Sequence, residues 1–166
     1  MTVSKPSTLF STSLQTISGT VRNLHHEQLE YVNPEKPAHD HSSVYYKRFF
    51  ISKFNLEDRA IEAKFSTPMK LTEGDEVTVS GYPKGKVFSV LAYKNTTQQV
   101  SGHENWIVLA LGAIFFFAVT IGLLNSDLVA QGALIPKLFL LGFTMVAMYM
   151  GYRAFLIYAA IRLISS

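Results

Sequence analysis

Four histidines lie in one polar stretch of the sequence, His25, His26, His39 and His41, together with several carboxylates. Two imidazoles separated by one residue, with a carboxylate nearby, form a ligand set that can hold Zn²⁺ or another divalent ion. The same stretch contains prolines and glutamates, which are typical of a solvated loop in which histidines occur without binding metal. We therefore interpret it as a solvated hairpin tip with no cofactor, and keep a zinc site as the alternative.

Aromatic and basic side chains alternate in "YYKRFFISKF", residues 45–54. In a strand, Tyr45, Lys47 and Phe49 would share one face, and Arg48 would lie on the other. In small barrels that bind nucleic acid, comparable strands carry stacking aromatics and phosphate-binding bases. Residues 1–105, however, hold twelve basic and eleven acidic residues, so little electrostatic attraction for a polyanion is expected. We expect this segment to form a barrel wall whose exposed side chains contact a protein, and we do not expect nucleic acid.

The sequence contains no recognisable catalytic motif. A glycine-rich phosphate loop, HExxH, GxSxG and a Ser-His-Asp arrangement are all missing from it. The chain also has no cysteine, which excludes disulfides, thiolate metal sites and cysteine nucleophiles. We therefore expect no enzymatic activity.

The residues in front of the long apolar segments have the pattern of strands and turns. Strands are expected near residues 16–24, 44–54, 59–66, 75–82 and 85–93, because apolar and polar residues alternate or β-branched and aromatic residues cluster there. Five short strands would leave two exposed edges in an open sheet, whereas a closed barrel has none. The sequence therefore predicts an all-β small barrel over residues 16–95.

Three motifs carry a resemblance to the OB-fold: Gly19-Thr20-Val21, the segment "GDEVTVSG" at residues 74–81, and residues 87–93. In layout the chain resembles membrane-anchored OB-fold proteins of the NfeD type, which join a small barrel to membrane helices. In those proteins the helices usually precede the barrel, whereas here they follow it. A helix between the third and fourth strands, present in many OB-folds, would have to fit into residues 66–74, and we do not expect one. An SH3-like barrel is the alternative.

Two apolar segments follow the barrel. Residues 106–124 contain no charge, and at 1.5 Å per residue they extend about 28 Å, enough to cross the hydrocarbon core of a bilayer. Trp106 at the start suits an interfacial anchor. After a loop at residues 125–137, residues 138–164 form a second expected span. The fold class is thus a barrel followed by a two-helix transmembrane hairpin, with residues 1–15 as an arm and 96–105 as a tether.

The second span contains Arg153, the one basic residue well inside an apolar segment. The favoured interpretation is that its side chain extends to the nearer headgroups. The alternative is an acidic partner on another subunit, because neither span contains an acid. Small residues at helical spacing, Ala118 with Gly122 and Ala147 with Gly151, would allow helices to pack closely.

Charge around the spans predicts their orientation. Arg153 and Arg162 flank the C-terminal end, whereas the loop between the spans offers Lys137 opposed by Asp127. The positive-inside rule then places both termini in the cytoplasm, and we expect a bacterial inner-membrane protein. The predicted function is a non-enzymatic scaffold whose barrel contacts another membrane protein or a second copy of the chain. The alternatives are an accessory subunit of a transporter or small pore that uses Arg153, and a membrane-permeabilising toxin.

Overall fold

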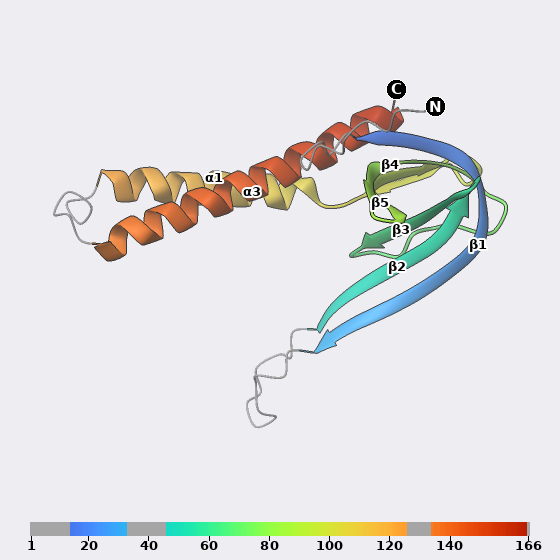
Figure 1. Ribbon diagram of the computed structural model, residues 1–166, viewed down its shortest axis with the longest axis horizontal. Helices are drawn as coiled ribbons and strands as arrows, with labels where there is room; N and C mark the ends of the chain where they lie inside the picture. Colours follow the sequence, from blue (N-terminus) through green and yellow to red (C-terminus); the bar gives the residue numbers. More distant parts are fainter. Residues whose placement is uncertain (1–13, 33–45, 126–133, 166) are drawn as a thin grey trace, which may run out of the picture. The chain divides into compact units, whose positions relative to one another are not determined.

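The computed structural model describes residues 14–32, 46–125 and 134–165. The chain divides into two compact units, residues 1–102 and residues 103–166 (Figure 1). The first unit is built from strands and the second from two helices. Expected features at residues 1–13, 33–45 and 126–133 lie outside the described residues, including most of the arm and of the loop between the spans.

The first unit is a closed barrel, as the sequence predicts. Its strands are β1 (Gln15–Val32), β2 (Tyr46–Leu56), β3 (Arg59–Phe65), β4 (Glu76–Lys84), β5 (Val87–Asn95) and β6 (Val100–His103). They are ordered β3-β2-β1-β4-β5-β6, and a parallel pairing of β3 with β5 closes the five-stranded barrel. Because β4 returns to lie beside β1, the first four strands form a Greek key.

The barrel core is formed by apolar side chains at alternate positions along the strands. In β3, Ile61, Ala63 and Phe65 are buried, and the residues between them face outward. Met69 and Leu71, from the segment between β3 and β4, join the same core. That segment contains no helix in the described structure, as expected. Two apolar side chains on an irregular segment therefore help to fill the barrel.

Strand β1 is longer than predicted. The stretch with His25 and His26, expected to be a loop, continues β1 to Val32, and its partner along this length is β2. A register shift between Arg22 and His25 marks a β-bulge. The carboxylate of Glu73 accepts hydrogen bonds from the amides of Asn23 and Leu24, at 2.7 and 2.9 Å, so the bulge leaves these donors satisfied.

The outer part of the β1–β2 pair is called the ribbon here and is defined as Glu27–Val32 of β1 with Tyr46–Ile51 of β2. Pairing between β2 and β3 begins only at Phe50, so Tyr46 to Phe49 have β1 as their one strand partner in the described structure. Figure 1 shows these two strands continuing together past the rest of the barrel.

A polar network joins the segment before β4 to the end of β5 and to the turn that follows β5. The Asp75 carboxylate accepts hydrogen bonds from the Thr72 amide (2.8 Å), Asn95 Nδ2 (2.7 Å) and Gln98 Nε2 (2.6 Å). Burial of this carboxyl acts to raise its pKa, but these hydrogen bonds favour the charged form and hold the pKa of Asp75 below its usual value.

The expected tether, residues 96–105, is largely part of the barrel. Thr96 to Gln99 form a turn whose Gln98 belongs to the Asp75 network, and Val100–His103 form β6 beside β5. Only Glu104 and Asn105 remain between β6 and the first helix.

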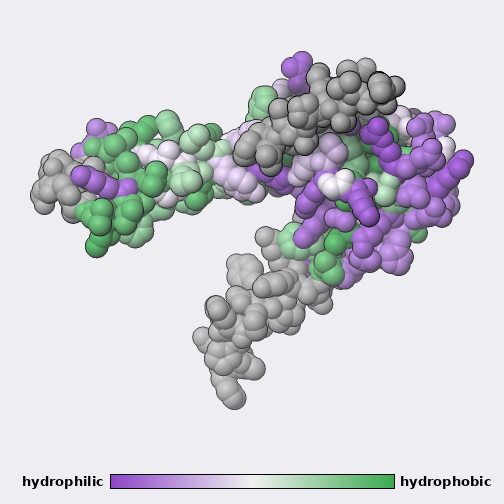
Figure 2. Space-filling model, in the orientation of Figure 1, coloured by the Kyte–Doolittle hydropathy of each residue, from purple (hydrophilic) through white to green (hydrophobic). Residues whose placement is uncertain are grey.

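The second unit consists of two antiparallel helices, α1 (Trp106–Leu124) and α3 (Leu134–Ser165). The bounds of α1 match the predicted span, and α3 begins four residues before the predicted residue 138. Both helices are long and apolar enough to cross a membrane. Figure 2 shows their surface as mostly hydrophobic, in contrast to the largely hydrophilic barrel. The expected barrel followed by a helical hairpin is therefore confirmed.

Candidate functional site

The predicted aromatic and basic segment forms the start of β2. Tyr45 lies outside the described residues, and Lys47 is placed only by its strand position, opposite Tyr31 of β1. Arg48 is exposed and Phe49 is half-buried. Because neighbouring strand residues face opposite sides, Arg48 and Phe49 contribute to different faces of the ribbon.

One face of the ribbon combines apolar and charged side chains in cross-strand rows. Leu29 lies opposite Phe49, and Ile51 lies between Glu27 on β1 and Lys64 on β3. We call these five residues the outer ribbon face. Leu29 is 48% exposed and is the one large apolar residue of the described barrel in the exposed class. An exposed leucine beside a half-buried phenylalanine is the surface feature of the barrel that most suits a protein contact.

The charges around this apolar pair are compensated by neighbours. Lys64 Nζ lies 4.3 Å from the centroid of the Phe49 ring, a cation–π geometry. Lys53 Nζ donates to both carboxylate oxygens of Glu27 at 3.0 Å. The outer ribbon face is therefore an apolar centre with one carboxylate and one ammonium group at its rim, the carboxylate paired with Lys53. This balance of charge does not favour a polyanion.

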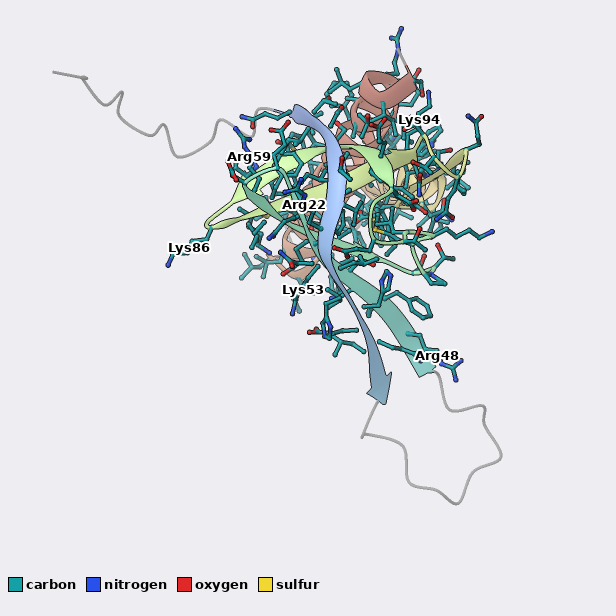
Figure 3. The ribbon with its side chains drawn as sticks, turned by 90° about the vertical axis from the view of Figure 1, so that its right-hand side faces the viewer. Arg22, Arg48, Lys53, Arg59, Lys86 and Lys94 are labelled. Carbon is teal, nitrogen blue, oxygen red and sulfur yellow. The ribbon has the colours of Figure 1, made fainter. Side chains whose placement is uncertain are left out.

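Other basic side chains are dispersed over the barrel. In Figure 3, Arg48 and Lys53 lie along the β1–β2 pair and Lys94 lies elsewhere on the barrel. Arg59 and Lys86 line one pocket, together with the acidic Asp58. Phosphate binding by charge neutralisation requires several cations on one surface. This dispersed arrangement gives no support to nucleic-acid binding.

The described histidines lie on a strand rather than in a loop. His26 Nδ1 is 2.9 Å from Ser52 Oγ on the core side, whereas His25 Nε2 is 3.5 Å from Glu27 Oε1 at the surface. Their rings therefore do not converge. His39 and His41 lie outside the described residues, and the part of the chain that is described holds no group of three potential metal ligands. The zinc site stays a prediction.

Arg153 has an acidic partner within its own chain. Its Nη2 donates to Glu104 Oε2 at 2.9 Å, and the two side chains are 25% and 28% exposed. Glu104 precedes Asn105, the N-cap of α1, whose Oδ1 accepts a hydrogen bond from the Val108 amide. An acid from another subunit is thus not required to pair Arg153. Sequence reasoning considered acids only inside the spans and so missed Glu104.

The predicted small-residue pairs have different positions. A Cβ added to Gly151 would lie 3.8 Å from Ala113 Cβ, and Ala147 is buried, so this pair lies where α3 packs on α1. Ala118 is exposed, and a Cβ on Gly122 would meet nothing within 4 Å. Gly112, which was not predicted, packs against Met150. Only one of the two predicted pairs therefore serves the contact within the hairpin.

Comparison of the chain with protein-family models, with curated proteins and with solved structures finds no match.

Proposed function

We propose that this chain is a non-enzymatic integral membrane protein whose barrel is an OB-type module that binds a protein partner beside the bilayer. The resemblance in layout to NfeD-type proteins is part of the same proposal. The Greek-key order and the parallel β3–β5 closure favour an OB-type barrel over the SH3-like alternative.

The observation that carries the proposal is the short connection between barrel and hairpin. β6 ends at His103 and α1 begins at Trp106, so the link is Glu104 and Asn105. Two extended residues reach about 7 Å, which would hold the barrel next to the membrane surface. Both linking side chains are also engaged, Glu104 with Arg153 and Asn105 as the helix cap. Such a short link suits a domain that acts at the bilayer surface rather than one joined to its membrane anchor by a long flexible linker.

The outer ribbon face is the proposed binding surface. Its exposed Leu29 and half-buried Phe49 offer apolar area, and of its rim charges Glu27 pairs with Lys53 and Lys64 lies over the Phe49 ring. Interfaces between proteins commonly combine an apolar centre with a polar rim. The partner is therefore proposed to be another protein, with nucleic acid excluded from the proposal.

The proposed location is the bacterial inner membrane, with the barrel and both termini in the cytoplasm. Arg162 occupies the last turn of α3, while Lys137 is in the first. Together with the many basic residues of the barrel, Arg153 and Arg162 place more positive charge on the side of the termini, which the positive-inside rule assigns to the cytoplasm.

The transporter or pore alternative is less well supported. It assigns Arg153 to a conduction path or to an acid on another protein, but this guanidinium already pairs with Glu104 at the start of α1. The toxin alternative has no feature in its favour beyond two apolar helices.

Site-specific photo-crosslinking in cells tests the proposed surface. A photoreactive amino acid replaces exposed Leu29, and a matched control replaces Lys86, which is exposed in the turn between β4 and β5. We expect a discrete protein adduct from position 29 that is lost on Phe49→Asp, and none from position 86. Equal adducts at both positions, or an adduct removed by nuclease, would contradict the proposal.

Membrane insertion is tested separately in the unmodified chain. We expect it to stay in the pellet after extraction with alkaline carbonate, and its barrel to resist protease added to spheroplasts. Release by carbonate would contradict the membrane assignment, and cleavage from outside would contradict the cytoplasmic orientation.

A further inference from the structure

One face of α3 has exposed residues at the spacing of a packed helix seam. The intervals between them alternate between three and four residues, and each side chain is between 52% and 71% exposed. The residues are Leu138, Leu141, Met145, Met148, Tyr152 and Phe155. Tyr149, next to Met148, is 65% exposed as well. A repeat of three and four residues is the pattern by which two helices pack along a left-handed seam. We call these seven residues the α3 seam.

The seam residues lie outside the most closely packed part of the contact between α3 and α1. Ala147, Gly151 and Ala154 are buried or half-buried, and Gly151 faces Ala113 of α1. At 100° per residue, these positions lie about 120–180° from Met145 but only about 60–120° from Met148, so Met148 is at the side of the seam nearer α1. The exposure of the seam side chains shows that the hairpin leaves most of their surface uncovered.

Two tyrosines place hydroxyl groups deep in the expected membrane interior. Gly151 is level with Ala113, so Tyr149, two residues nearer the start of α3, is level with about Phe115. Phe115 is nine residues from each end of α1, which is roughly 13 Å from either end. Helix side chains also lean toward the N-terminus of their own helix, so Tyr149 leans away from the end marked by Trp106 and Tyr158. Its hydroxyl therefore does not reach the headgroups at that end.

These hydroxyls differ from the threonine hydroxyls of the hairpin. Thr120 and Thr144 each donate to a carbonyl of their own helix, at 2.9 and 2.8 Å. Within the described residues, the Tyr149 and Tyr152 hydroxyls have no hydrogen-bond partner. A hydroxyl facing lipid tails without a partner is unfavourable, and tyrosine is usually found at the membrane interface instead. A partner helix that supplies a hydrogen-bond acceptor at this depth would remove the free-energy cost of the unpaired hydroxyl.

We propose that the α3 seam binds the α3 seam of a second copy of this chain. In a two-fold dimer whose axis runs along the membrane normal, each residue near the axis meets its own copy at the same depth. A tyrosine hydroxyl is both donor and acceptor. Across such an axis the Tyr149 hydroxyls of the two copies hydrogen-bond to each other, and so do the two Tyr152 hydroxyls. The seam residues are otherwise uncharged, which allows identical surfaces to meet. This inference rests on the membrane insertion of the proposed function and names the partner of the hairpin.

Disulfide cross-linking tests the seam directly, because the chain contains no cysteine. Single cysteines are placed at seam positions with Met145→Cys and Met148→Cys. The matched control is Ile114→Cys, which is 65% exposed at similar depth on α1. The full chain is oxidised in its native membrane, and we expect covalent dimers from the two seam variants and little from the control. Dimers from position 114 alone, or from none of the three, would overturn the proposal.

The tyrosine hydroxyls are tested by Tyr149→Phe and Tyr152→Phe, which keep the ring. A hydrogen bond between membrane helices contributes little enough that we expect the dimer to weaken about three- to tenfold for each change, measured by energy transfer between labelled copies at increasing lipid dilution. Phe155→Leu is the control at a seam position without a hydroxyl. Unchanged dimerisation in both tyrosine variants would overturn the assigned hydrogen bonds.

Carbonate extraction of the same variants separates the two proposals. An inserted protein that remains monomeric contradicts the α3 seam alone. A protein released from the membrane contradicts the proposed function as well.

Discussion

The barrel and the hairpin use apolar residues in opposite ways. In the barrel, thirteen apolar residues form one core in which none is more than 6% exposed. Except for Leu29, all the large apolar residues that are exposed in the described chain lie in the hairpin. The barrel thus hides its apolar side chains from water, whereas the hairpin presents them outward, as a protein surrounded by lipid does. Apolar content alone would not separate the two units, but the burial of each residue does.

Polar groups show the same contrast. The Asp75 carboxylate in the barrel joins partners up to twenty-three residues away in sequence. In the hairpin, Arg153 bonds to Glu104 forty-nine residues away, but the hydroxyls of Thr120 and Thr144 bond to carbonyls four residues back in their own helix. Long-range hydrogen bonds require the whole barrel to be folded, whereas the local bonds in a helix form wherever the helix does. The barrel is therefore expected to depend on individual residues more than the hairpin does.

The largest expected difference comes from shortening an apolar side chain. Ile61→Ala removes a residue that is 2% exposed in the barrel core, and we expect the free energy of unfolding to fall by about 2–5 kcal/mol. Ile114→Ala, at a side chain 65% exposed on α1, should change it by less than about 0.5 kcal/mol. Hydrogen exchange of the full chain in detergent at increasing urea measures both. Similar losses in the two variants would remove the contrast between the units.

Glycine substitutions provide a second comparison. A Cβ at Gly81, beside the register shift of β4, would collide with the Ser89 carbonyl of β5, whereas a Cβ at Gly122 of α1 meets nothing within 4 Å. We expect Gly81→Ala to destabilise the barrel by about 1–3 kcal/mol, because backbone rather than a flexible side chain must move. Gly122→Ala should leave the hairpin unaffected. Barrel exchange that is unchanged in Gly81→Ala would show that the two strands separate without strain.

The Asp75 network should make the barrel, but not the hairpin, sensitive to acid. The pKa of Asp75 is lowered in the folded chain, so the stabilisation is fully present above the ordinary pKa of 3.8 and is lost as the pH falls through the lower folded value. We expect exchange in barrel peptides to rise below about pH 4 relative to hairpin peptides. Asp75→Asn should remove this difference. A barrel that responds equally to acid with either residue would show that another carboxyl is responsible.

Removing the side chain of Asn95, a donor to Asp75, measures the contribution of the Asp75 network to stability at neutral pH. Asn95 is fully buried and donates to both Asp75 and the Lys70 carbonyl. Asn95→Ala should therefore cost about 1–3 kcal/mol, since it leaves buried acceptors without their donor. Lys94→Ala, next to it and exposed, is the matched control. A similar small effect in both variants would contradict the role of the network.

The sequence predicted the parts of the fold that depend on local patterns. Alternation identified the inward residues of β3, and an uncharged segment identified α1 with its bounds. It did not predict that β1 extends to Val32, because residues 25–32 are mostly polar. Those residues form a strand because β2 pairs with them, and a pairing partner is not visible in local composition.

The candidate site was predicted in a similar way. The apolar and basic start of β2 could be recognised from its residues, but Leu29 could not, because its importance comes from lying opposite Phe49. β6 was assigned to a tether because four residues with one glycine give little strand signal, and it is the closeness of Gly102 to the Tyr93 ring that explains the glycine. Contacts between residues distant in sequence were thus the part that composition and periodicity did not supply.

The smallest expected effect concerns the ion pair of the hairpin, Arg153 with Glu104. Both side chains are about one-quarter exposed, so solvent screens part of their attraction, and we expect a coupling energy of no more than about 1 kcal/mol. A double-mutant cycle with Glu104→Gln and Arg153→Gln, read from hydrogen exchange in the first turn of α1, isolates that coupling from the effect of each change alone. Arg162→Gln, at an exposed position in the last turn of α3, should show no coupling to Glu104. Strict additivity of the first two changes would mean that the pair contributes nothing to the hairpin, and that packing of α3 on α1 determines its register.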